Sequence, residues 1–485
     1  MPQESLKKKT VRGLGWSATD NVLKMGITFV VSIVLARLLT PDEYGLIGIL
    51  MIFISVFNAI VDSGFTSALI RKQNIQDIDF STAFWTNLAL SIVMALTLFF
   101  CAVPIAHFFG RQELLPLTQV MSCVVVINAF ALVQRARMTK NIDFKTQTKV
   151  TVISSVISGA VGIGMAFCGF GVWSLVGQQI SLQLLTTIFL WFFNRWLPKF
   201  QFSKTSFAEM WSFGWKLLVS SLIDTTWKEI YQVVVGKCYS PATLGLYTRA
   251  KQFSQLASTN LTIIIQRVSF PVLSSIQDDK VRLKSAYCRV IRTTMLPTFV
   301  LMLGMTACAK SMILVLIGEK WIGCVPLLQL ICLTGMLYPL HAINLNMLQV
   351  QGRSDLFLKL EIIKKIIAIG PLLLGIFISI YWMLIGSFIA SCFSYYLNAY
   401  YSGPFLNYSI KAQIKDILPS FGVAISTAFP LYLLSFLPFS PYILFPLQLI
   451  LGVMLTLFVN EKANLPEYNE IKKIVKPLFL KFNKR

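Results

Sequence analysis

Charge is scarce in this chain, and acidic charge is scarcest. Of 485 residues only 13% are Asp, Glu, Lys or Arg, and 21 acidic side chains stand against 43 basic ones. With 55% hydrophobic residues and a mean hydropathy of +0.69, the chain has too little polar surface for a soluble globule. Histidine occurs only at His107 and His341, and the nine cysteines form no Cys-x-x-Cys pair. A zinc site of the usual spacing and a disulfide framework are therefore not expected.

The chain also lacks the features of a membrane enzyme. It has no Gly-rich phosphate-binding loop, and its outer connections are no longer than roughly a dozen residues. A membrane glycosyltransferase or polymerase that uses Asp42 and Glu43 as external carboxylates would need an ordered outer loop or domain to position sugar and acceptor. We therefore expect no enzymatic activity, no catalytic residues, and neither a metal nor a cofactor.

Long apolar runs are what the sequence has in abundance. Stretches such as 27–35 and 88–102 lack the in-out alternation of a membrane β-strand and belong to segments long enough to cross a bilayer as helices. Hydropathy predicts an all-α polytopic membrane protein with about fourteen transmembrane helices, near residues 13–38, 44–70, 83–106, 114–138, 148–168, 171–194, 209–236, 248–272, 289–317, 325–349, 359–379, 382–402, 417–437 and 440–460.

The basic residues are concentrated in alternate connections between these helices. One set carries most of them, including Arg135, Arg137 and Lys140 at the end of the fourth predicted helix. The other set offers only Arg111, Lys237 and Lys320. The positive-inside rule places the basic connections, and with them both termini, in the cytoplasm.

Two stretches of the chain follow one plan. Both open with Gly-Trp, continue with an Asp-x-x-x-Lys pair and close with Ser/Thr-Pro-x-x-x-Gly-Leu. These features fall at Gly15-Trp16 and Gly214-Trp215, at Asp20/Lys24 and Asp224/Lys228, and at 40–46 and 240–246. Coincidence between two amphipathic helices that end at a Pro/Gly turn is the alternative interpretation.

A duplication predicts the domain organisation. The seventh to twelfth helices would copy the first to sixth in the same orientation, as a parallel repeat. We expect an N-terminal lobe over residues 1–205, a C-terminal lobe over 206–405, two additional helices over 406–460 and a basic cytoplasmic tail over 461–485. Two six-helix lobes would then face one another across a cavity.

Ionisable residues inside membrane spans are costly and usually line a water-filled cavity. Here they concentrate on the first, second, seventh and eighth predicted helices, which hold equivalent places in the two halves. The basic members expected to bind an anionic head group are Lys24, Lys216, Lys228, Arg249 and Arg267. The polar members expected to line the cavity or to couple transport to an ion are Asp20, Asn21, Asp62, Asp224, Glu229, Gln252 and Gln255.

A purely structural interpretation stays open for these residues. The pairs Asp20/Lys24 and Asp224/Lys228 have the i,i+4 spacing at which charges neutralise each other. Arg249 and Arg267 can extend toward helix ends. Asp62 has no basic residue within four positions, which suits a proton carrier, although a hydrogen-bonded helix-packing role is the alternative.

Three motifs carry a resemblance to a known family. They are Ala-Arg-Leu-Leu-Thr-Pro-Asp-Glu-Tyr-Gly at 36–45, Asp-Ser-Gly-Phe at 62–65 with Leu-Ile-Arg at 69–71, and Tyr-Ser-Pro at 239–241 with Leu-Gly-Leu-Tyr at 244–247. In these motifs, and over nearly its whole length, the chain resembles the Wzx-type polysaccharide flippases of the multidrug/oligosaccharidyl-lipid/polysaccharide (MOP) exporter superfamily, in the branch used for colanic and teichuronic acid.

The resemblance implies a flippase of the bacterial inner membrane. Such a protein translocates polyprenyl-pyrophosphate-linked oligosaccharide repeat units by alternating access, for export of lipopolysaccharide or exopolysaccharide. Its partners would be the lipid-linked oligosaccharide, of the undecaprenyl pyrophosphate type, membrane lipids, and polymerase and export machinery, but no nucleic acid. The alternative with the same architecture is a cation-coupled MATE-like small-molecule exporter, against which the basic excess argues. Coupling to H⁺ or Na⁺ is left open.

Overall fold

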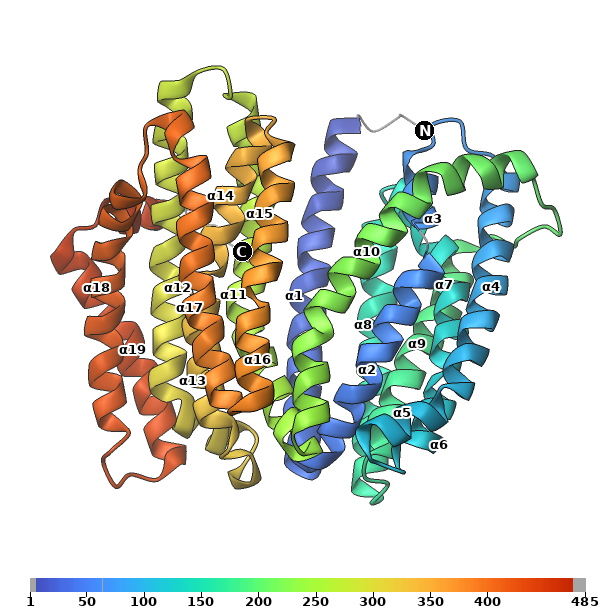
Figure 1. Cartoon of the computed structure of the whole chain (residues 1–485), viewed down its shortest axis with the longest axis horizontal. Coiled ribbons are helices and arrows are strands. Elements are labelled where there is room, and N and C mark those ends of the chain that lie inside the picture. Colours follow the sequence, from blue (N-terminus) through green and yellow to red (C-terminus); the bar gives the residue numbers. More distant parts are fainter. Residues whose placement is uncertain (1–5, 63, 474–485) are drawn as a thin grey trace, which may run out of the picture. The chain divides into compact units, whose positions relative to one another are not determined.

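Every regular element in the described chain is a helix. The computed structural model describes residues 6–62 and 64–473, and Figure 1 shows the helices in sequence colours. Within that part, 11 helical segments are long and apolar enough to cross a membrane. The prediction of an all-α polytopic membrane protein is confirmed.

The number of crossings stays a prediction, because three predicted helices are not among those 11 segments. Two of them are α10 (Lys204–Cys238) and α11 (Pro241–Ser275), which are long but carry the polar residues that the sequence analysis singled out. The third is divided into α15 (Ser354–Ile367) and α16 (Ile369–Phe377), and neither piece alone is long enough to span a bilayer.

The chain folds as two compact units, Met1–Gly245 and Leu246–Arg485. The first contains α1 (Leu6–Leu38), α2 (Pro41–Asp62), α3 (Phe65–Arg71), α4 (Asp77–Phe100), α5 (Ala102–Phe109), α6 (Leu114–Met121), α7 (Cys123–Lys140), α8 (Phe144–Phe167), α9 (Trp173–Asn194) and α10. The second contains most of α11, then α12 (Lys280–Leu316), η1 (Glu319–Trp321), α13 (Cys324–Gly335), α14 (Tyr338–Val350), α15, α16, α17 (Ile380–Ser402), η2 (Pro404–Leu406), α18 (Ile410–Leu434) and α19 (Pro441–Ala463).

The packing units and the sequence repeat divide the chain differently. The predicted lobes meet between residues 205 and 206, where the repeat restarts, whereas the compact units meet within the first turns of α11. The difference is α10, which packs against α2, α3 and α4 of the first unit. This helix therefore belongs to the predicted C-terminal lobe by sequence and to the first unit by its contacts.

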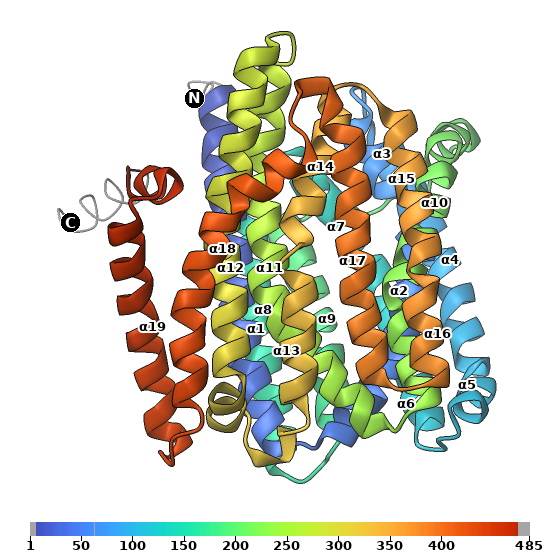
Figure 2. The same ribbon diagram turned by 60° about the vertical axis from the view of Figure 1, so that its left-hand side comes forward.

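The same helix pairings occur inside each unit. In the first, α4 packs on α7, α7 on α9, and α8 on α9. In the second, α12 packs on α13, α13 and α14 on α17, and α16 on α17. In predicted helix order these are the third with the fourth, the fourth with the sixth and the fifth with the sixth, repeated in each half. The recurrence supports the duplication, and α18 and α19 lie outside it along α12 (Figure 2).

The turn that closes each repeat is a helix cap. Glu43 Oε2 accepts hydrogen bonds from Thr40 N at 2.6 Å and from Thr40 Oγ1 at 2.9 Å, and Pro41 opens the helix. This is a capping box followed by proline at the first helical position. In the second copy Ser240 Oγ accepts from Thr243 N at 3.2 Å. The helix predicted from residue 44 therefore begins at residue 41.

A glycine separates α2 from α3 and brings α10 close. Gly64 has a φ of +70°, and a Cβ there would lie 2.7 Å from the carbonyl oxygen of Gly214 on α10. The next residue, Phe65, is fully buried in an aromatic core that includes Phe84 and Trp196. The Asp-Ser-Gly-Phe motif thus ends one helix and anchors the next.

Candidate functional site

Two of the predicted cations are open to binding. Lys24 on α1 and Lys216 on α10 are exposed, and neither forms an ion pair within the described part of the chain. Asp20 lies four residues before Lys24 and is half-buried, but no ion pair joins the two. Because a cation in a membrane protein is stable only beside water, an anion or a polar surface, both lysines suit an anionic ligand.

The second Asp-x-x-x-Lys pair forms an ion pair. Lys228 Nζ lies 2.6 Å from Asp224 Oδ2, with the two side chains 69% and 58% exposed. This is the i,i+4 neutralisation that the sequence left open as an alternative. An exposed pair of this kind contributes only about 0.3–0.5 kcal/mol, so an incoming anion can displace the carboxylate. Beside it, the half-buried Glu229 accepts a hydrogen bond from Gln232.

The polar stripe of α2 contacts other helices of its own unit. Asn128 of α7 donates to Asn58 Oδ1 at 2.9 Å and accepts from Gln183 of α9 at 2.7 Å. Asp62 is half-buried at the end of α2 and accepts from Thr66 Oγ1 at 2.5 Å. Asn21 on α1 is exposed and makes further interactions. Asn128 and Gln183 were not singled out in the sequence because neither is ionisable.

The predicted residues of the second unit have mixed environments. Arg249 is only 3% exposed, donates to Gln252 Oε1 at 2.6 Å and lies 5.7 Å from the ring centre of Trp321. Its guanidinium is therefore held inside the unit. Gln255 is exposed on α11, and the side chain of Arg267 lies outside what the structure describes. Substrate contact by any of the twelve predicted residues stays a prediction.

The second unit also contains a buried polar network that the sequence did not identify as a unit. Asn344 Oδ1 of α14 accepts from Tyr287 of α12 and from Ser402 of α17, each at 2.7 Å. One turn before it, His341 lies 2.8 Å from Ser391 and 3.2 Å from Asn398, both on α17. The sequence signal is the i,i+3 spacing of His341 and Asn344, which puts both on one face of α14.

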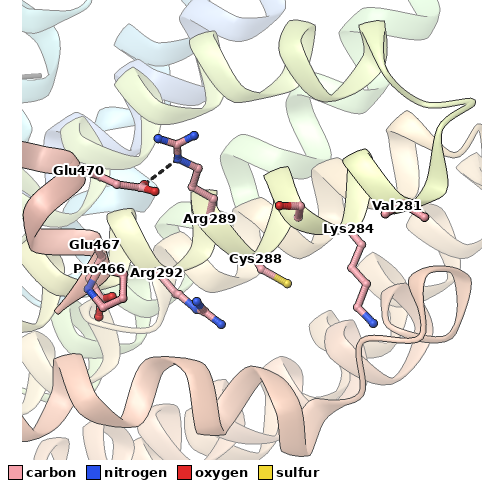
Figure 3. Close-up of a pocket in the computed structure, with 9 residues that line it drawn as sticks. Val281, Lys284, Cys288, Arg289, Arg292, Pro466, Glu467 and Glu470 are labelled. Atoms are coloured by element: carbon pink, nitrogen blue, oxygen red, sulfur yellow. Dashed lines mark hydrogen bonds and ion pairs between the residues drawn. The ribbon is translucent and has the colours of Figure 1, made fainter. Parts of the chain in front are cut away.

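One cavity in the described part of the chain contains none of the predicted site residues. It has a volume of about 440 Å³ and lies between the start of α12 and the segment after α19. Figure 3 shows Arg289 turned toward Glu470, which it contacts at 2.6 Å, while Arg292 is paired with Asp416 at 2.6 Å. Because these cations already have carboxylate partners, we do not assign the cavity to the substrate.

A metal site is not evident in the part of the chain that the structure describes. No group of three or more His, Cys, Asp or Glu residues there has the arrangement to hold a metal ion. The expectation that the protein works without a metal or cofactor stays a prediction.

The sequence matches a family of polysaccharide biosynthesis proteins over residues 34–326, which include all three motifs. The lipopolysaccharide biosynthesis protein WzxC of Escherichia coli (strain K12) is 26% identical over 376 residues, covering 76% of each chain. The succinoglycan biosynthesis transport protein ExoT of Rhizobium meliloti (strain 1021) is 27% identical over 333 residues, 68% of this chain and 67% of that protein. The teichuronic acid biosynthesis protein TuaB of Bacillus subtilis (strain 168) is 24% identical over 355 residues, 73% of each.

Solved structures show the same fold. The lipid II flippase MurJ in an inward closed conformation has a TM-score of 0.71 at 15% identity, covering 93% of this chain and 98% of its own. An inward-facing multidrug resistance MATE family transporter of the MOP superfamily has a TM-score of 0.61 at 15% identity, covering 79% and 96%. The family match confirms the resemblance drawn from the three motifs: this chain belongs to the family of polysaccharide biosynthesis proteins, as a Wzx-type member of the MOP superfamily.

Proposed function

We propose that this protein translocates polyprenyl-pyrophosphate-linked oligosaccharide repeat units across the bacterial inner membrane, for export of a surface polysaccharide. The observation that carries the proposal is the set of relatives, which match two thirds to three quarters of the chain and are named for lipopolysaccharide, succinoglycan and teichuronic acid. These polymers differ, so a shared carrier of lipid-linked units explains the common sequence better than a sugar-specific activity.

The residues of the first unit suit such a substrate. Lys24 and Lys216 offer two exposed cations without ion-pair partners in the described chain, and Lys228 offers a third that is only weakly held by Asp224. A diphosphate is a compact anion that ammonium groups bind well when water is partly excluded. Polar side chains beside them, such as Asn21, would hydrogen-bond sugar hydroxyls, while the polyprenyl tail stays in the lipid.

The proposal also covers the direction of transport and the conformational change that transports the substrate. The basic connections place both termini in the cytoplasm, so the head group enters from the cytoplasmic leaflet. The division of the chain into two compact units supports alternating access. The energy source is open between H⁺, Na⁺ and neither. Polymerase and export machinery of the same polysaccharide are its proposed partners.

Depletion of the protein tests the function directly. Lipid-linked repeat units should accumulate with their sugars accessible only from the cytoplasmic side, and surface polymer should fall. The double variant Lys24→Ala/Lys216→Ala should behave similarly at normal protein abundance. The control is Lys149→Ala, which removes an exposed cation of α8. Polymer that still reaches the surface in depleted cells, without accumulation of precursor, would reject the proposal.

The MATE-like fold keeps a small-molecule exporter as the second candidate. That function favours an acidic site for cationic compounds, whereas the open charged groups described above are basic. Efflux of a cationic dye that depends on this protein, in cells that export polymer normally, would favour it.

The orientation has its own test, because a fluorescent protein fused to the C-terminus should fold and fluoresce in the cytoplasm.

A further inference from the structure

The last turns of α7 carry three basic side chains, and two of them are used in packing. The guanidinium of Arg137 lies 5.9 Å and 5.7 Å from the ring centres of Phe80 and Trp196. Lys140 Nζ donates to the carbonyl oxygen of Leu69 at 3.1 Å, near the end of α3. Both cations therefore stabilise the corner where α3, α4 and α7 meet.

Arg135 makes no packing contact of this kind in the described part of the chain. It lies within the segment Leu114–Lys140, one of those long and apolar enough to span a membrane, and its side chain is half-buried. It forms neither a hydrogen bond nor an ion pair with the residues that the structure describes. The carboxylates of the neighbouring helices have other contacts: Asp62 accepts from Thr66, and Asp79 pairs with Lys72 at 3.1 Å.

The face of α7 that carries Arg135 also carries two polar side chains that contact other helices of the first unit. Residues 128, 132, 135 and 139 lie on one helical stripe because they are spaced by three or four. Asn128 on this stripe contacts Asn58 of α2 and Gln183 of α9, and Thr139 accepts from Gln147 of α8 at 3.1 Å. Arg135 therefore lies along α7 between Asn128 and Thr139, two side chains that contact three other helices of the first unit.

A half-buried guanidinium without a carboxylate is costly in a membrane protein unless an anion accompanies it during function. We propose that Arg135 binds the diphosphate of the lipid-linked substrate, as a further cation of the first unit in addition to Lys24, Lys216 and Lys228. Its planar fork of donors matches phosphate oxygens in pairs, which an ammonium cannot do. This inference rests on the proposed function and adds one residue and one ligand group to it.

The test uses the full chain purified in detergent and geranylgeranyl diphosphate as the probe, with geranylgeraniol as the uncharged control. Ligand binding is measured as the shift of the melting temperature over a concentration series. The wild type should bind the diphosphate in preference to the alcohol, and Arg135→Ala should weaken diphosphate binding by about tenfold or more. Arg135→Lys should fall between the two, because it keeps the charge and loses the paired donors.

The matched control is Lys149→Ala, which removes an exposed cation from the neighbouring α8. It should bind as the wild type does, and all variants should bind geranylgeraniol equally. If Arg135→Ala or Arg135→Lys proves unstable, the other variant still decides the question. Equal diphosphate binding by the wild type and the Arg135 variants would overturn the inference and leave the proposed function intact. A wild type that does not prefer the diphosphate would overturn both.

Discussion

Replacing Gly45 by alanine should destabilise the first unit, because there is no room for a side chain at this position. A Cβ on Gly45 would lie 1.8 Å from the carbonyl oxygen of Pro241 and 2.4 Å from its carbonyl carbon. The reverse contact exists as well, since a Cβ on Gly245 would lie 1.9 Å from the carbonyl oxygen of Pro41. The starts of α2 and α11 thus pack backbone to backbone, each glycine against the proline of the other turn.

The size of the effect follows from these distances. Ordinary contact of a Cβ begins at 3.4 Å, so the two helix starts must separate by about 1.6 Å. The opposing atoms are backbone atoms of a proline in a capped helix, and they cannot rotate away. Overpacking of this kind costs about 1–3 kcal/mol. At an open helical position the same substitution stabilises by about 0.5–1 kcal/mol, so the sign of the effect distinguishes the two situations.

Thermal unfolding in detergent, followed by tryptophan fluorescence, is a suitable assay. Gly45→Ala should melt below the wild type, and the controls Gly26→Ala and Gly422→Ala, where nothing lies within 4 Å of the added Cβ, should melt at or above it. The double variant Gly45→Ala/Gly245→Ala should cost less than the two single variants added together, because one displacement relieves both contacts. A Gly45→Ala protein as stable as the controls would refute the reasoning.

Three further predictions concern polar contacts. Lys72 contacts both Asp79, which is 2% exposed, and Glu209, which is 62% exposed. Lys72→Met should therefore lower the free energy of unfolding by about 1–3 kcal/mol, whereas Glu209→Gln should change it by less than about 0.5 kcal/mol, as measured by thermal unfolding. His341→Ala should destabilise more than Ser391→Ala, because it leaves the buried Asn398 and Ser391 without their shared partner; equal melting temperatures would argue against the network. Hydrogen bonds from Arg353 lower the pKa of Asp355 from its ordinary 3.8 to about 2. The interaction is thus present above pH 3.8 and lost as the pH falls to 2, and Arg353→Gln should return the midpoint to near 3.8 in carboxyl ¹³C NMR of labelled aspartate.

The sequence was sufficient for the fold class because apolar length alone decides whether a segment can cross a bilayer. It also marked α10 and α11, together with the first two predicted helices, by their polar residues, and hydropathy counted all four as spans, whereas α10 and α11 are absent from the 11 segments that are long and apolar enough to cross a membrane. Hydropathy does not report packing partners, however. The assignment of α10 to the first unit depends on its contacts with α2, α3 and α4, for which the sequence has no local signal.

For the candidate site, the sequence predicted which helices carry polar side chains, but it did not predict which residues those side chains contact. Spacing left an ion pair between Asp224 and Lys228 open as the alternative to a binding role, and the structure has this pair. The same spacing left a pair between Asp20 and Lys24 open, and the structure has no ion pair between them. An i,i+4 pair is worth too little to fix two side chains against other demands, so small differences in surroundings decide which pair forms.

Arg135 shows why charge counting in the sequence has a physical limit. The positive-inside rule treats Arg135, Arg137 and Lys140 as equal contributions to orientation, because each is a basic residue near a helix end. The free-energy cost of placing each charge in the folded protein differs, since Arg137 lies beside aromatic rings and Lys140 donates to backbone oxygens. Of these three, only Arg135 forms neither a hydrogen bond, an ion pair nor a ring contact with the described residues, so its charge contributes nothing visible to stability there. A residue that serves orientation alone would tolerate replacement by any cation at any nearby position. If Arg135→Lys and Arg135→Ala both bind diphosphate as the wild type does, orientation is the role of Arg135; if both bind it more weakly, the guanidinium is needed for the ligand.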